Sequence, residues 1–293
     1  MKPAEFDYAR PGSVAEALDM LARHPDAKLL AGGQSLLTLM NLRLARPAVL
    51  IDIGGLTELT RIFDDTGDLI LGALVTHRTV ETDPLIAARA PLLADAASYI
   101  GHIGIRNRGT IGGSIAHADP AAEMPLAAVA LGATCHVESL RRGRRTVAAQ
   151  DMFVSFYTNA LEPDEMLTWI SIPAIGPDQG WGFVEYAHQH GDYGLAGAGV
   201  VLRLGDDGRV REIRAAVLNA ADRPVLFTGG AAVGEHPGPA LWEHVAAGWV
   251  AETEPAADDE AYARHLCAAA LIEAMTAAQH RASERFEEST AQW

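Results

Sequence analysis

Two glycine pairs, each set in a short polar segment, constrain this chain more strongly than any other feature. The first segment is Ala31-Gly32-Gly33-Gln34-Ser35-Leu36, and the second is Thr110-Ile111-Gly112-Gly113-Ser114. Because glycine lacks a Cβ atom, the backbone of such a segment approaches a ligand closely. Consecutive N–H groups there form a concavity that binds anions, and hydroxyl groups add donors. We predict that the two segments face each other and hold a diphosphate, although either alone is also typical of a tight turn.

Other glycine-based or catalytic sites do not fit the spacing. The sequence has no G-x-x-x-x-G-K-[ST], which argues against a P-loop, and no G-x-G-x-x-G between an early strand and a helix. Residues 112–116 have the spacing of a hydrolase serine loop only in part, because no strand is predicted before them. The histidines His117, His188 and His190 lack further ligands at a metal-site spacing. We predict no catalytic residue and no metal site on this chain.

The first part of the chain alternates between strand and helix patterns. Ser13 and Glu16 form a capping box before a helical stripe of apolar residues. Residues 101–120 contain five glycines and few large apolar side chains, so we predict a long functional loop there. The other predicted elements are strands at 28–31, 49–53, 69–74 and 133–137, and helices at 36–45, 84–99 and 121–131.

A change of composition at 175–180 marks a predicted domain boundary. Beyond it, residues 197–204 and 210–218 read as strands, and the Asp-Gly pair between them indicates a hairpin. Helices are predicted near 239–251 and 258–280. The second half is therefore expected to be an antiparallel sheet backed by helices.

Charge and cysteine content narrow the functional classes. Twenty-three basic and 38 acidic residues give a net charge of −15, which disfavours binding to nucleic acid or to anionic membranes. Only Cys135 and Cys267 are present, so a cluster held by four thiolates of this chain is excluded. No apolar run approaches the roughly 20 residues of a membrane span, and residues 1–6 lack the apolar core of a signal peptide. We expect a cytoplasmic protein without a transmembrane segment.

One basic run, Arg141-Arg142-Gly143-Arg144-Arg145, stands out in this acidic chain. It lies between two predicted strands. It is interpreted as a solvated hairpin turn, with a docking patch for an acidic partner as the alternative.

Three segments together resemble a known family. Ala-Gly-Gly-Gln-Ser-Leu-Leu at 31–37, Thr-Ile-Gly-Gly-Ser at 110–114 and Gly-Asp-Tyr at 191–193 are similar to the FAD-binding medium subunit of molybdenum hydroxylases, the carbon monoxide dehydrogenase and xanthine dehydrogenase family. The resemblance covers essentially the whole chain, in order. The sequence departs from the family pattern at three places. Position 123 is Glu, where many relatives carry Asp, and His188 and His190 lie where arginines are common. Position 34 is Gln, where carbon monoxide dehydrogenases carry His.

The resemblance implies an α+β fold. Residues 1–176 would form an FAD-binding domain of the vanillyl-alcohol-oxidase-like (PCMH) type, with α/β subdomains at about 1–55 and 56–176. Residues 181–293 would form the C-terminal domain, an antiparallel sheet with helices. By position, Ala31 to Leu36 and Thr110 to Ser114 would hold the FAD diphosphate and ribityl chain. Asp119 and Glu123 would make polar contacts to FAD, and Tyr193 would lie against the isoalloxazine ring.

The resemblance also implies a function. The chain would be the FAD-carrying electron-transfer subunit of an oxidoreductase, taking electrons from a small subunit with [2Fe-2S] clusters. A large subunit would hold the molybdenum cofactor and the substrate, and the complex would be a dimer of heterotrimers. Quinone, NAD and oxygen all stay open as acceptors. Two alternatives are a standalone FAD-dependent oxidase of the same superfamily and a scaffold that has lost the flavin.

Overall fold

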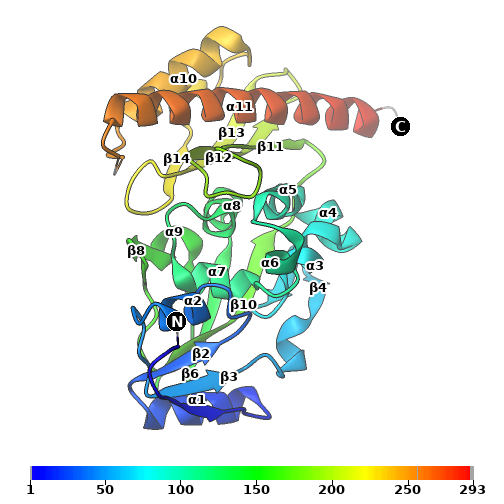
Figure 1. The fold of residues 1–293 in the computed structure, drawn as a ribbon. Coiled ribbons are helices and arrows are strands. Elements are labelled where there is room, and N and C mark those ends of the chain that lie inside the picture. Colours follow the sequence, from blue (N-terminus) through cyan, green and yellow to red (C-terminus); the bar gives the residue numbers. More distant parts are fainter. Residues whose placement is uncertain (1, 256, 291–293) are drawn as a thin grey trace.

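In the computed structural model, which describes residues 2–255 and 257–290, helices and sheets are stacked in layers (Figure 1). A small parallel sheet lies at one end, in the order β1 (Asp7–Ala9), β3 (Val49–Asp52), β2 (Ala27–Leu30). Helix α1 (Val14–Arg23) packs on it, and helix α2 (Leu36–Asn41) follows the first glycine segment. The predicted strands at 28–31 and 49–53 are confirmed.

The start of α1 shows how local sequence sets this layer. The Ser13 hydroxyl accepts a hydrogen bond from the Glu16 N–H at 3.2 Å, as the capping box predicts. The returning bond differs by one residue, since the Glu16 carboxylate accepts from the Gly12 N–H at 2.7 Å. Both bonds satisfy donors at the helix entrance.

A five-stranded antiparallel sheet forms the middle of the molecule. Its order is β4 (Ile62–Asp65), β5 (Asp68–Gly72), β10 (Glu165–Pro173), β6 (Thr134–Ser139), β7 (Gly143–Ala148). The surrounding elements are η1 (Thr57–Thr60), α3 (His77–Thr82), α4 (Pro84–Arg89), α5 (Pro91–Tyr99), α6 (Ile103–Arg106), α7 (Ile111–His117), α8 (Glu123–Leu131), α9 (Ala149–Met152), β8 (Phe153–Ser155) and β9 (Thr158–Asn159).

Two predictions for this region are wrong. The helix expected at 84–99 is two helices, because Pro91 cannot continue the hydrogen bonding of α4. The loop expected at 101–120 contains α6 and α7, so the second glycine segment starts a helix. The Thr110 hydroxyl caps α7 by accepting from the Gly113 N–H at 3.1 Å, which offsets the low helix propensity of the glycine pair.

The C-terminal part is an antiparallel sheet covered on both faces. Its strands follow one another as β11 (Gln179–Tyr186), β12 (Ala196–Leu204), β13 (Val210–Leu218) and β14 (Val225–Thr228). The hairpin between 204 and 210 is confirmed. After η2 (Gly230–Ala232), α10 (Pro239–Ala251) and the long α11 (Glu260–Thr290) form the outer layer, while α5 and α8 lie under the sheet (Figure 1).

The basic run spans the β6–β7 turn and the start of β7, and its arginines have partners within the chain. Arg142 pairs with Asp164 at 3.1 Å and Arg144 with Glu138 at 3.1 Å. Arg145 binds both oxygens of the buried Glu165 at 2.6 and 2.7 Å, and Arg141 donates to the Ala22 carbonyl. The structure therefore favours the hairpin interpretation over the docking patch.

Candidate functional site

The two glycine segments lie against each other, as predicted. A Cβ on Gly32 would lie 2.0 Å from the carbonyl oxygen of Arg108 and 2.9 Å from the Cα of Gly109. On the other side, a Cβ on Gly113 would lie 3.9 Å from the Ala31 Cβ. Only glycine at position 32 permits the two backbones to approach so closely. The contact between the segments therefore explains why position 32 is a glycine.

The first segment offers a run of free backbone donors. In the described part of the chain, the N–H groups of residues 32–36 donate no hydrogen bond. These residues are half-buried. Gly33 adopts a left-handed conformation with φ 74°, and the Gln34 amide donates to the Gly32 carbonyl at 3.2 Å. Because half-buried amide groups usually have partners, the run indicates an anionic ligand.

The second segment differs from the prediction. The N–H groups of Ile111 and Gly112 donate to the carbonyls of Val75 and Ala73, both at 3.0 Å. The Gly113 N–H is used by the cap at Thr110. These amides therefore fasten α7 to the chain after β5 and do not form a second anion cradle. The segment presents the half-buried Gly113 and Ser114 instead.

Carboxyl groups gather at the other end of α7. Asp119 is buried, and its carboxylate accepts from the Ala121 N–H at 3.0 Å. Glu123, at the first residue of α8, is also buried, and desolvation raises the pKa of its carboxyl to about 7. Desolvation and, to a smaller extent, Glu123 raise the pKa of Glu185 on β11 to about 8. Within the described chain, one Glu185 oxygen is buried without a partner.

The raised pKa of Glu185 predicts that the stability of the folded chain depends on pH. The folded chain holds a proton on Glu185 between the ordinary pKa of 4.5 and about 8, so stability should fall as the pH rises through that window. Glu185→Gln should be about 1–2 kcal/mol more stable than the parent above pH 8 and no more stable below pH 4.5, after allowance for partial solvation. Denaturant unfolding at both pH values measures this. Glu243→Gln, on an exposed part of α10, is the control, and equal gains from both variants at high pH would contradict the assignment.

Tyr193 lies beside these carboxyl groups. It is 76 % exposed and belongs to the loop between β11 and β12. Partial desolvation and the charges of Asp119 and Glu123 raise its pKa. The aromatic ring is thus available at the α8 end of the site.

Several residues of this region were not found by sequence reasoning. Ala118, Tyr157 and Asn219 all have positive φ, at 54°, 51° and 55°. They are joined, since the Tyr157 N–H donates to the Ala118 carbonyl at 3.0 Å and the Asn219 N–H donates to the Pro120 carbonyl at 3.2 Å. Such conformations concentrate at functional sites. Asparagine is the residue type among them that tolerates this conformation, but its contact with residue 120 is not visible in sequence.

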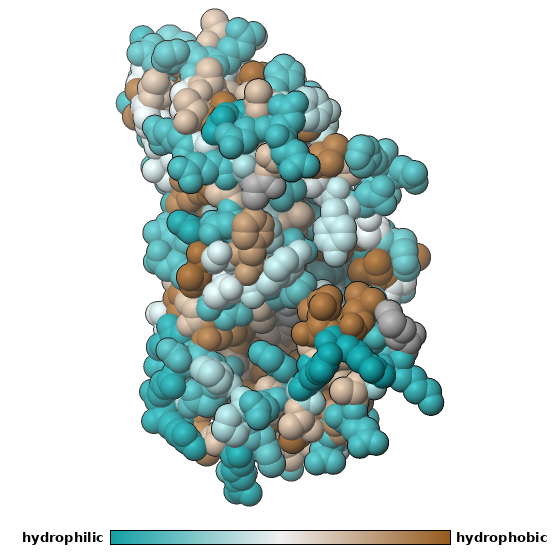
Figure 2. Space-filling view, turned by 60° about the vertical axis from the view of Figure 1, so that its left-hand side comes forward, coloured by the Kyte–Doolittle hydropathy of each residue, from teal (hydrophilic) through white to brown (hydrophobic). Residues whose placement is uncertain are grey.

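The face that carries α2 is hollowed and partly apolar. Figure 2 shows a hollow below the middle of this face, with a group of apolar side chains at its edge. The exposed apolar residues of the α2 region are Leu37, Leu42 and Leu44, and the β8–β9 hairpin adds Val154 and Phe156. A hollow with apolar borders is suited to a planar organic ligand.

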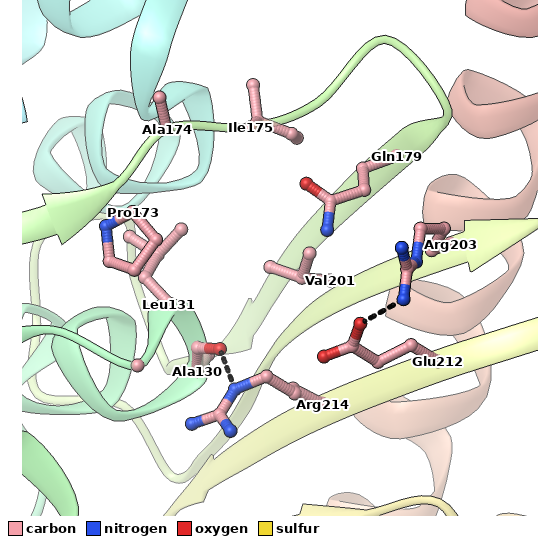
Figure 3. A pocket seen from close by; sticks show the side chains of 11 residues that line it. Ala130, Leu131, Pro173, Ala174, Ile175, Gln179, Val201, Arg203, Glu212 and Arg214 are labelled. Carbon is pink, nitrogen blue, oxygen red and sulfur yellow. Dashed lines mark hydrogen bonds and ion pairs between the residues drawn. The ribbon is translucent and has the colours of Figure 1, made fainter. Parts of the chain in front are cut away.

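Another cavity, of about 250 Å³, lies between the end of α8 and strands β12 and β13 (Figure 3). Both of its arginines bind groups of the chain, although the Arg203 Nε atom is buried without a partner among the described residues. Arg214 donates to the Ala130 and Val129 carbonyls in the last turn of α8, and Arg203 pairs with Glu212 at 2.9 Å. None of the predicted site residues lines it. We therefore interpret Arg214 in this cavity as a cap for the C-terminal end of α8, and the cavity is not a candidate functional site.

The histidines show no metal site. His190 packs edge-on against Tyr99 at 5.5 Å, and His117 lies 5.2 Å from the Tyr157 ring. Across residues 2–255 and 257–290, no group of three or more possible metal ligands is found. Nor does any helix within these ranges have both the length and the hydrophobicity of a transmembrane helix.

The fold and the paired glycine segments define a cofactor-binding protein, and comparison identifies its family. Residues 4–175 match the family described as the FAD binding domain in molybdopterin dehydrogenase. The chain belongs to this family. FAD is therefore its cofactor, and the chain is a subunit of an FAD-dependent oxidoreductase.

Two similar proteins are named as medium subunits. The chain is 45 % identical over 224 residues to the nicotine 6-hydroxylase medium subunit of Paenarthrobacter nicotinovorans, covering 76 % of this chain and 77 % of that protein. It is 40 % identical over 231 residues to the carbon monoxide dehydrogenase medium chain of Hydrogenophaga pseudoflava, covering 78 % and 80 %.

Solved structures agree over nearly the whole chain. A carbon monoxide dehydrogenase from H. pseudoflava that lacks the Mo-pyranopterin moiety of its cofactor matches with a TM-score of 0.91 and 37 % identity, covering 96 % of this chain and 99 % of that chain. Quinoline 2-oxidoreductase from Pseudomonas putida 86 matches with a TM-score of 0.90 and 35 % identity, over 96 % and 99 %. The chain is a medium subunit of the molybdenum hydroxylase type, with the mixed helix and sheet fold of these structures.

Proposed function

We propose that this chain is the FAD-carrying electron-transfer subunit of a molybdenum hydroxylase complex. The observation that carries the proposal is the run of amides at 32–36 that have no hydrogen-bond acceptor among residues 2–255 and 257–290, held against the backbone before α7. This arrangement fits a diphosphate, because amide donors neutralise its charge without lysine or metal.

The residues of the site fit two parts of FAD, the diphosphate and the isoalloxazine ring. The amides and hydroxyls of Gly32 to Ser35, with Ser114, would hold the diphosphate. Helix α7 has 7 residues and so is about 10 Å long, which separates the diphosphate site from the carboxyl groups beyond it. Asp119 and Glu123 would accept hydrogen bonds there, and Tyr193 would cover the ring. Glycine at 113 adds no side chain of its own between these two parts.

The partner subunits that we propose would carry the cofactors for which this chain has no ligands. Bound FAD supplies chemistry that accepts electrons singly or in pairs. The two cysteines, both buried and free, exclude a four-thiolate cluster on this chain. We therefore place [2Fe-2S] clusters on a small partner and the molybdenum cofactor on a large one, in a dimer of heterotrimers. The domain layout would be the PCMH-type FAD domain at 1–176, with subdomains at about 1–55 and 56–176, and a C-terminal domain at 181–293, of which residues 291–293 lie outside the described residues.

The names of the relatives support a substrate site on another subunit. Medium subunits at 45 % and 40 % identity belong to proteins named for nicotine and for carbon monoxide, two molecules of very different size and shape. A subunit that contacted the substrate would be expected to differ more between such proteins.

The complex, purified through a tag on this chain, tests the proposal. We expect one FAD per chain, two copurifying subunits that carry iron and molybdenum, and bleaching of the flavin absorbance by an organic substrate only when both partners are present. The isolated chain, loaded with FAD, is the control. Bleaching of that chain by an organic substrate alone would overturn the proposal in favour of a standalone oxidase, and purified complex without flavin would favour a scaffold.

A further inference from the structure

The loop that carries Tyr193 is held at both ends, although the tyrosine itself is exposed. At its start, Gly191 packs so closely on the earlier chain that a Cβ there would lie 2.6 Å from the Gly101 carbonyl oxygen. At its end, the Leu195 N–H donates to the Tyr186 carbonyl at 2.6 Å. The loop is therefore held at both ends, and Tyr193 is exposed on it together with Asp192 and Leu195.

One residue from another strand holds the middle of this loop. Asn219 follows β13, and its side-chain amide donates to the Gly194 carbonyl at 2.6 Å and lies 3.5 Å from the Leu195 carbonyl. Its backbone N–H donates to the Pro120 carbonyl at 3.2 Å. Asn219 thus joins the residue after Tyr193 to the residue after Asp119, two segments that are distant in sequence.

The backbone of Asn219 makes both bonds possible. With φ 55°, its N–H and its side chain point to different segments. Asparagine adopts this left-handed conformation at low cost, and its terminal amide supplies two donors and one acceptor. An aspartate would keep the shape but would place a carboxylate against two carbonyl oxygens.

We propose that Asn219 is a positioning residue, which fixes Tyr193 beside the Asp119 turn and so sets the contact of the tyrosine ring with the flavin. The flavin contact rests on the proposed function. The positioning of the loop does not, because every bond that carries it lies within this chain.

Hydrogen exchange and flavin fluorescence together test this role in the FAD-loaded subunit. We expect Asn219→Asp to speed exchange of the amides at 192–195 by about tenfold, in line with the loss of a side-chain bond. We also expect its flavin fluorescence to move toward that of Tyr193→Ala. Asn219→Gly, which keeps the left-handed backbone, should give the same result if the aspartate variant does not fold. The matched control is Asn159→Asp, which loses a side-chain bond to the Ala116 carbonyl and should leave exchange at 192–195 unchanged.

The outcomes are separable. Unchanged exchange at 192–195 in a folded Asn219 variant would overturn the positioning role. Faster exchange with no change in fluorescence would overturn its effect on the flavin contact. A parent subunit that bound no FAD would overturn the proposed function, while the exchange rates would still decide whether Asn219 holds the loop.

Discussion

Gly32→Ala is expected to abolish retention of FAD. The added Cβ would lie 2.0 Å from the Arg108 carbonyl oxygen and 2.7 Å from its carbonyl carbon, and neither backbone atom has room to rotate away. The two segments must separate, which moves the free amides at 32–36 out of register with the surface of α7. We expect FAD affinity to fall at least about 100-fold and stability by about 1–3 kcal/mol, as for other overpacked sites. The flavin-to-protein absorbance ratio after gel filtration and thermal unfolding measure both effects.

The same change at an open position provides the control. In the described structure, nothing lies within 4 Å of a Cβ on Gly248, on an exposed part of α10. Gly248→Ala should therefore keep full FAD occupancy and be stabilising by up to about 1 kcal/mol through helix propensity. Full occupancy in Gly32→Ala would show that the segments do not need this close approach, and the proposed diphosphate site would be lost.

Gly182→Val is expected to destabilise the C-terminal layer most strongly. Helix α11 lies directly on the backbone of β11, where a Cβ on Gly182 would be 2.0 Å from the Ala274 carbonyl oxygen. Gly180 makes the same approach to Ala278. The helix cannot yield locally, because its neighbouring residues are buried on the same sheet. We expect a loss of about 3 kcal/mol or more.

Denaturant unfolding followed by tryptophan fluorescence measures this loss. Trp181, stacked under Arg281 at 4.6 Å, reports on the same contact. Gly248→Ala is again the control, since it lies in the same helical layer but outside the contact. A Gly182→Val protein with parental stability would mean that the helix and strand do not meet as described.

Local signals in the sequence predicted much of this structure. The capping box at Ser13, the Asp-Gly hairpin and the antiparallel C-terminal sheet depend on residues close in sequence or on strict periodicity, and the structure confirms them. The short helices α6 and α7 were missed because their glycines argue for a loop, whereas α7 is held by bonds from Ala73 and Val75. Those bonds depend on the tertiary fold.

The site was predicted unevenly for the same reason. The first glycine segment has the free amides that its composition indicates, while the amides of the second are used internally. Asn219 and Tyr157 could not be found, because their roles depend on contacts with residues 118–120 that only the fold creates. The assignment of individual residues to FAD stays a prediction.

Helix α8 gives the two halves of the chain a common interior. All of its residues from Glu123 to Leu131 are buried, and its apolar cluster includes Ala216 and Leu218 of β13. The polypeptide crosses from one half to the other after β10, but the two halves pack against each other at this helix. Because β13 packs on this helix, a tilt of the outer sheet would displace the carboxyl group at position 123, which the proposed function places beside FAD.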